Sequence, residues 1–80
     1  YPNPFNPQTA FTLAVQQAQR VEVSVYDVLG RRVARLFDGA LPAGAAHVFA
    51  FDGAGLPGGT YVIAATGERF AARQTAILLK

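Results

Sequence analysis

The 80-residue chain contains no cysteine, no methionine and no tryptophan. The absence of cysteine excludes a disulfide framework and any metal site built on thiolates. Because methionine is missing, we expect the chain to be a piece of a longer protein. No run approaches the ~20 apolar residues that a membrane-spanning helix needs, and the N-terminus lacks a signal-peptide pattern. We therefore expect no transmembrane segment.

Charged residues are also scarce, since they make up 15% of the chain and leave a formal net charge of only +2. Proteins that bind nucleic acid through phosphate contacts carry a denser basic stripe, so we expect no nucleic-acid partner. Hydrophobic residues make up 51% of the chain, which is too many for a disordered segment. The length allows one folded domain, which we expect to span residues 1–80.

Residues 1–8 form a proline-rich lead-in segment, with proline at positions 2, 4 and 7. Each proline fixes φ and removes a backbone donor, which excludes a helix or a central strand here. A free linker would gain nothing from large aromatic side chains, whereas this segment carries Tyr1 and Phe5. We expect it to run as an extended edge segment that docks on the domain.

Beyond the lead-in, apolar and polar residues alternate with a period of two, which is typical of half-buried β-strands. Val21, Val23 and Val25 give the clearest example. Turn residues separate such runs, so we expect an all-β, immunoglobulin-like antiparallel β-sandwich of about seven strands. The expected strands centre on residues 11–15, 21–26, 33–37, 47–51, 61–64 and 70–79, and the expected turns on 27–30, 38–39, 42–44, 52–53 and 57–59.

The residue types that carry catalysis in enzymes are isolated in this sequence. His47 is the only histidine and alternates with phenylalanines, and Ser24 is the only serine and lies inside a regular strand. Asp27, Asp38 and Asp52 fall at expected turns, where a carboxylate binds nearby backbone N–H groups. No loop has the oxygen-rich spacing of a calcium site, and the glycine-rich stretch 52–59 lacks a phosphate-binding pattern. We therefore expect no enzymatic activity, no metal and no cofactor.

Two kinds of binding stay open at this point. Carbohydrate-binding modules present a row of tryptophan or tyrosine to sugar rings, and here Tyr1, Tyr26 and Tyr61 are the available residues. The arginines allow two interpretations. They are solvated residues that discourage edge-to-edge aggregation, or they dock the domain to an acidic partner or an anionic glycolipid surface.

Five segments of the chain, in this order, resemble one known family. They are Tyr-Pro-Asn-Pro-Phe-Asn-Pro at 1–7, Val-Tyr-Asp-Val-Leu-Gly-Arg-Arg-Val at 25–33, Leu-Pro-Ala-Gly at 41–44, Leu-Pro-Gly-Gly-Thr-Tyr at 56–61 and Ile-Leu-Leu-Lys at 77–80. Together they are similar to the type A C-terminal sorting domains of the type IX secretion system. That family also resembles the immunoglobulin-like domain of flagellar hook-capping proteins.

The resemblance implies a non-catalytic module that directs the secretion and cell-surface attachment of a larger exported protein. The implied partners are the outer-membrane secretion and attachment machinery and, for some members, an anionic lipopolysaccharide. The implied location is secreted, at the bacterial cell surface or outer membrane. The cargo of such domains is often a polysaccharide hydrolase or a protease. A carbohydrate-binding or adhesive accessory module and a structural spacer are the alternatives.

The same resemblance points to the residues that other molecules recognise. The first choices for recognition or anchoring are Gly59, Tyr61, Arg73 and Lys80, and the second choices are the hairpin residues Gly30, Arg31 and Arg32. The backbone freedom of glycine explains Gly30 and Gly59 equally well. The sequence departs from the family at Phe51, where relatives often carry tryptophan, and in its last strand, which has fewer basic residues than many relatives.

Overall fold

The computed structural model describes residues 8–79, and these form six β-strands. The strands are β1 (Gln8–Leu13), β2 (Gln19–Tyr26), β3 (Arg32–Leu41), β4 (His47–Asp52), β5 (Gly59–Gly67) and β6 (Ala71–Leu78). The all-β prediction is confirmed, whereas the expected number of seven strands is wrong for the part of the chain that is described. The docked lead-in was predicted for residues 1–8. Residues 1–7 lie outside the described residues, and Gln8 begins β1.

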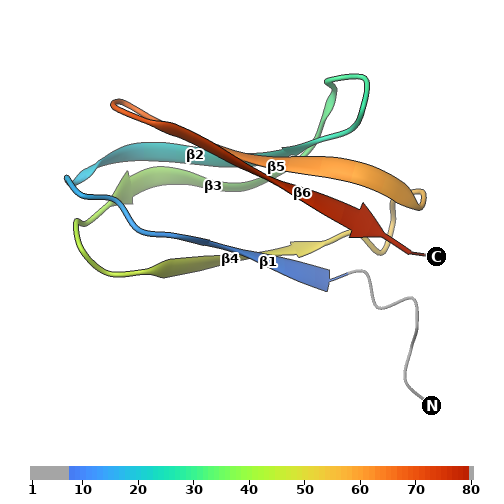
Figure 1. Ribbon diagram of the computed structural model, residues 1–80, viewed down its shortest axis with the longest axis horizontal. Coiled ribbons are helices and arrows are strands. Elements are labelled where there is room, and N and C mark those ends of the chain that lie inside the picture. The colour runs from blue at the N-terminus through green and yellow to red at the C-terminus, as the bar shows by residue number, and fades with distance from the viewer. Residues whose placement is uncertain (1–7, 80) are drawn as a thin grey trace, which may run out of the picture.

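The strands form two antiparallel sheets that lie in two layers (Figure 1). β1 pairs with β4 in a two-stranded sheet, and the second sheet has four strands in the order β3-β2-β5-β6. β2 and β5 are therefore the central strands of the larger sheet, and β3 and β6 are its two edges.

The core lies between the two layers, where the alternating pattern places the apolar side chains. Val21, Val23 and Val25 of β2 are at most 1% exposed, as a spacing of two residues predicts. Phe49 and Phe51 of β4 are buried in the same cluster. Burial of each such side chain contributes about 1.5–3 kcal/mol, so this cluster holds the two sheets together. A phenylalanine at position 51 fills a fully buried site.

β3 is longer than the sequence predicts. Residues 38–39 were expected to form a turn, but Asp38 and Gly39 pair with β2 and the strand continues to Leu41. The ring of Phe37 covers Gly39, since a Cβ at position 39 would lie 3.2 Å from the ring. An aromatic ring over a glycine compensates for the missing side chain, so packing outweighs the turn preference of the Asp-Gly pair.

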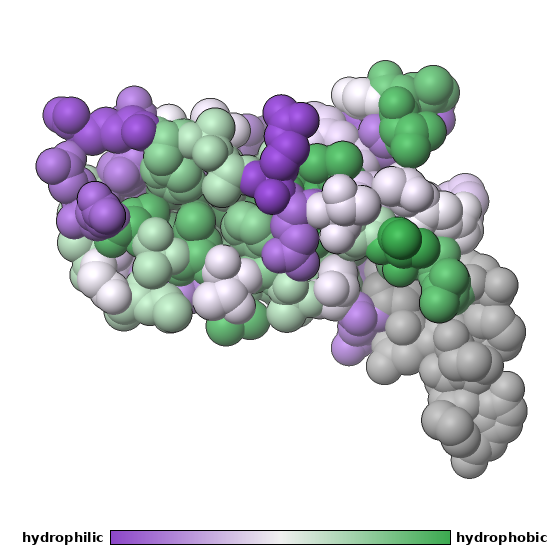
Figure 2. All heavy atoms as spheres, viewed as in Figure 1, coloured by the Kyte–Doolittle hydropathy of each residue, from purple (hydrophilic) through white to green (hydrophobic). Residues whose placement is uncertain are grey.

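The connections between strands fall at two opposite ends of the molecule. The end that we call the C-terminal end contains the β2–β3 turn (27–31), the β4–β5 turn (53–58) and the end of β6. The opposite end contains connections 14–18, 42–46 and 68–70. Figure 2 shows exposed apolar side chains at the C-terminal end and a cluster of hydrophilic side chains at the opposite end.

Candidate recognition surface at the C-terminal end

Asp27 fixes the β2–β3 turn through both of its carboxylate oxygens. Oδ1 accepts hydrogen bonds from the backbone N–H groups of Leu29 at 2.9 Å and Arg31 at 3.0 Å. Oδ2 accepts one from Nε of Arg31 at 2.8 Å. Gly30 has a φ of +82°, a left-handed conformation that glycine adopts without steric cost. The predicted local role of a turn aspartate is confirmed.

These contacts favour the ionised form of Asp27. The backbone N–H of Arg31, together with the Arg31 guanidinium and the N–H of Leu29, holds the pKa of the Asp27 carboxyl below its ordinary value. Burial raises the pKa of this carboxyl, but by less than the other contacts lower it. Donors that point at the carboxylate favour its charged form. The turn is thus held by a charged group at neutral pH.

The tip of this turn presents two large apolar side chains to solvent. Val28 and Leu29 are each 74% exposed. Ile77 in β6 and Leu79, which follows that strand, are also largely exposed. Among the described residues, Val48 is the other large apolar residue that is mostly exposed. Single exposed apolar residues are ordinary on protein surfaces, but a group of them at one end is typical of an interaction site.

The β4–β5 turn forms the other half of this surface. The hydroxyl of Tyr61 donates a hydrogen bond to the carbonyl of Pro57 at 2.7 Å, and its ring is buried against Phe51, with ring centroids 6.2 Å apart. Asp52 Oδ1 accepts a hydrogen bond from the N–H of Ala54 at 3.0 Å. Because a core residue anchors the turn through its side chain, the turn has a fixed position relative to the core.

A hollow of about 470 Å³ lies between the two turns. Val28, Leu29, Arg31 and Arg32 line one side of it, and residues 56–61 line the other. Its walls are mainly apolar side chains and turn backbone, a combination that suits an apolar side chain of a protein partner. Among residues 8–79, no three or more His, Cys, Asp or Glu side chains gather as metal ligands would.

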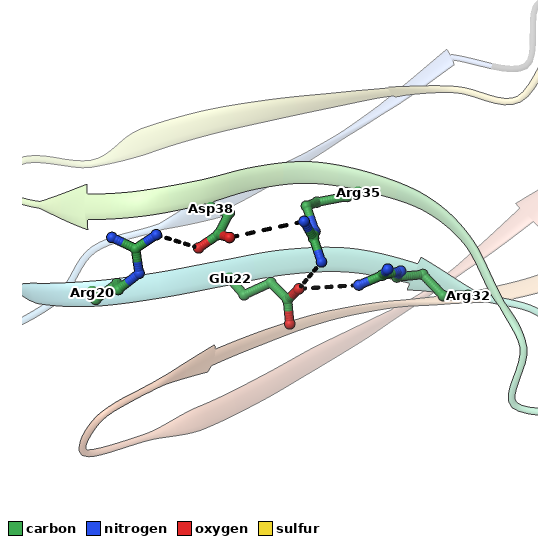
Figure 3. Close-up of polar contacts among 5 residues, drawn as sticks. All are labelled: Arg20, Glu22, Arg32, Arg35 and Asp38. Carbon is green, nitrogen blue, oxygen red and sulfur yellow. Dashed lines mark hydrogen bonds and ion pairs between the residues drawn. The ribbon is translucent and has the colours of Figure 1, made fainter.

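The outer face of β2 and β3 carries a chain of ion pairs (Figure 3). Arg20 pairs with Asp38 at 3.1 Å, Arg35 pairs with Glu22 at 3.1 Å and with Asp38 at 3.9 Å, and Arg32 pairs with Glu22 at 3.2 Å. These side chains are partly exposed, so each pair contributes only about 0.2–1 kcal/mol. The cations of this face are therefore largely compensated within the domain.

The structure brings five of the seven predicted recognition residues to the C-terminal end. Arg31 and Arg32 line the hollow from one side, Gly59 and Tyr61 line it from the other, and Gly30 lies within the adjoining turn. Each of the two arginines already has a carboxylate partner, Asp27 for Arg31 and Glu22 for Arg32. Tyr61 is 5% exposed, so its contribution to this surface is mainly to hold the turn.

The other two predicted residues are not part of this end. Arg73 lies in the middle of β6, on the outer face of the larger sheet, where it pairs with Ala64 of β5. Lys80 lies outside the described residues. Sequence reasoning did not single out Val28, Leu29 or Ile77 for a function. The available signal was the presence of two large apolar residues at the centre of an expected turn.

The two isolated residues with catalytic potential do not form a pair. Ser24 lies on β2 in the larger sheet, and His47 begins β4 in the smaller one. Within the described chain, Ser24 Oγ and His47 Nε2 are both buried and have no hydrogen-bond partner. A serine nucleophile needs a base within hydrogen-bond reach, and His47 does not supply one here.

Comparison with known protein families gives a match. The model of a family described as the secretion system C-terminal sorting domain matches residues 1–78. No curated protein and no solved structure gives a significant match to the chain. Residues 8–79 contain no helix that is long and apolar enough to cross a membrane. The match covers both turns that line the hollow.

Proposed function

The chain belongs to the family of secretion system C-terminal sorting domains, and from that premise we propose that its C-terminal end is the surface that the secretion machinery recognises. Membership in this family implies a C-terminal signal for type IX secretion, a secreted protein that is attached to the cell surface, and contact with the secretion machinery. Sorting domains of this kind are normally non-catalytic. We extend this to the present chain as a proposal.

One observation supports this choice of surface. The segments 25–33 and 56–61, which lie far apart in the sequence, meet around one hollow and are both fixed by side-chain-to-backbone hydrogen bonds. Preorganised turns lose little conformational entropy when they bind a partner. In this proposal the exposed Val28 and Leu29 make the contact, while Asp27 and Tyr61 hold the turns in place.

We also propose that residues 1–80 form one immunoglobulin-like sorting domain with a docked lead-in. In an immunoglobulin variable-type sheet, strand C′ neighbours C, which is followed by F and G, and strand B pairs with E. The order β3-β2-β5-β6 and the pair β1-β4 follow the same scheme, which supports the proposal. The parent protein would be a surface hydrolase of polysaccharides or a protease, retained by the attachment machinery or by an anionic lipopolysaccharide.

A reporter fusion tests the proposed function. A fluorescent protein joined upstream of residues 1–80 is expressed in a host that has a type IX secretion system, and surface fluorescence is compared with that of the reporter alone. We expect the fusion to reach the cell surface and the double variant Val28→Asn, Leu29→Asn to reach it much less. Val48→Asn is the matched control, because Val48 is 66% exposed but lies outside the C-terminal end.

Two outcomes would contradict the proposal. If the fusion stays in the periplasm while a reporter with an established sorting domain reaches the surface, the chain is not a sufficient signal. If the fusion reaches the surface and the double variant does so equally well, the signal is elsewhere on the domain. Thermal unfolding of the purified variants checks that each one is folded.

A further inference from the structure

β6 lies at one edge of the larger sheet. All eight of its residues pair with β5 in one continuous register. On its other side, none of the described strands pairs with it. An edge strand of this kind presents a row of backbone N–H and C=O groups that another chain can pair with.

The features that protect sheet edges are present on β3 and scarce on β6. β3 pairs with β2 through two register shifts, and it carries the ion-paired Arg32, Arg35 and Asp38. Bulges and charges of this kind prevent the addition of a further strand. β6 has no register shift, no proline and one charged residue, Arg73, and its Ile77 is 65% exposed.

The inner side of β6 is also incompletely covered. A cleft of about 450 Å³ lies next to the beginning of β6 and is lined by Leu13, Val15, Phe70 and Ala72, among others. Phe70 and Ala72 pack against the core but are only partly buried. A strand placed beside β6 would border this cleft and remove more of these apolar side chains from water, which is favourable.

The chemistry of the missing neighbour follows from the outer face of β6. Arg73, Thr75 and Ile77 point to that face, because residues two apart in a strand share a face. Among residues 8–79, no carboxylate lies within ion-pair distance of Arg73. β6 itself contains no Asp or Glu, so pairing with a second copy would leave both Arg73 side chains without a counter-charge. A foreign strand with an acidic residue would supply one.

We propose that β6 accepts an extended strand of the secretion machinery by β-sheet addition, with a carboxylate opposite Arg73 and an apolar side chain opposite Ile77. This inference rests on the proposed function and adds a second contact, along β6, to the one proposed at the C-terminal end. Main-chain hydrogen bonds supply affinity and the two side-chain positions supply specificity. Because Arg73 and Ile77 are four residues apart, the partner strand carries its acidic and apolar residues at the same spacing.

Amide hydrogen exchange of the purified 80-residue chain tests the proposal without any secretion. The probe is the peptide Val-Thr-Thr-Thr-Glu-Thr-Thr-Thr-Val, which places valine four residues from the glutamate in either strand direction. The control peptide has lysine at the centre. Some backbone N–H groups of β6 point away from β5, toward the free side of the strand. At a peptide concentration ten times the dissociation constant, we expect hydrogen exchange of these amides to slow about tenfold. The amides of β3 should not change.

A charge exchange sharpens the test. The variant Arg73→Glu should lose its response to the glutamate peptide and gain one to the lysine peptide. The proposal is overturned if neither peptide protects β6, or if both protect it equally in the unmodified chain. It is also overturned if β6 becomes protected with rising protein concentration alone, which indicates self-pairing, or if removal of residues 1–7 exposes a previously protected β6. None of these results affects export of the reporter fusion, so the proposed function is judged separately.

Discussion

The two edges of the larger sheet, β3 and β6, differ in how they use their charges. On β3, Arg32 and Arg35 share Glu22, and Arg35 also reaches Asp38. On β6, the single cation Arg73 has no such partner in the described part of the chain. The pairing of β3 is interrupted by register shifts, whereas that of β6 is regular. We call β3 the protected edge and β6 the open edge.

This difference shows that net charge alone does not identify an interaction surface. Arginines lie on both edges, but Arg32 and Arg35 on β3 pair with carboxylates, whereas Arg73 on β6 has no carboxylate partner among residues 8–79. The open edge ends beside the exposed apolar residues of the C-terminal end. One strand therefore links the two features that we assign to partner binding.

The largest effect on the free energy of unfolding is expected for a substitution in the core of the larger sheet, which supports both edge strands. Ile63 lies on the central strand β5 and is 0% exposed. Ile63→Ala creates a cavity and should lower the free energy of unfolding by about 2–5 kcal/mol, as measured by urea denaturation. A loss below about 1 kcal/mol would show that the site is less tightly packed than its burial indicates.

A substitution on the protected edge should have a smaller effect. Arg35→Gln removes ion pairs to Glu22 at 3.1 Å and Asp38 at 3.9 Å and should lower the free energy of unfolding by about 0.5–1 kcal/mol. Because exposed charges are screened by salt, the difference from the unmodified chain should shrink in about 1 M NaCl. An unchanged difference at high salt would indicate lost packing instead of lost charge.

The turn that leads into the protected edge should respond to acid. The pKa of Asp27 is lowered in the folded chain, first by the N–H of Arg31, so its contribution to stability is present above the unfolded value of about 3.9. That contribution is lost as the pH falls through the lower folded value. Carboxyl NMR titration should show the lowered pKa, and Arg31→Gln should bring it closer to the ordinary value. A pKa for Asp27 above about 4 would contradict this account.

The smallest effect on stability is expected on the open edge. Arg73→Gln removes a charge that has no carboxylate partner among residues 8–79, so the free energy of unfolding should change by less than about 0.5 kcal/mol. Arg35→Gln is the matched substitution on the other edge. Equal losses for the two variants would remove the distinction between a protected and an open edge.

Much of the fold was predictable from local patterns. The alternation of Val21, Val23 and Val25 identified the buried face of β2, and the turn at residues 27–30 followed from its residue types. The length of β3 was not predictable, because the ring of Phe37 lies over Gly39 only after the strand has paired with β2. Local turn preference carries no information about such packing.

The candidate surface was predictable in part. The segments 25–33 and 56–61 were identified from the sequence, and the structure places both at the C-terminal end. The ion pair of Arg32 with Glu22 could not be read from the sequence, because it depends on the register between β2 and β3 and on the shifts within it. That no carboxylate of the described residues pairs with Arg73 depends in the same way on which strand lies at the edge.

Export of two lysine variants of the reporter fusion tests directly whether the open edge binds the secretion machinery. Ile77 on the open edge and Val48 on β4 are 65% and 66% exposed, so both substitutions should leave the folded domain equally stable. We expect Ile77→Lys to lower the surface fraction of the reporter about tenfold, which corresponds to about 1.4 kcal/mol of binding free energy, and Val48→Lys to leave it unchanged. Equal surface fractions for the two variants would show that the open edge does not bind the secretion machinery.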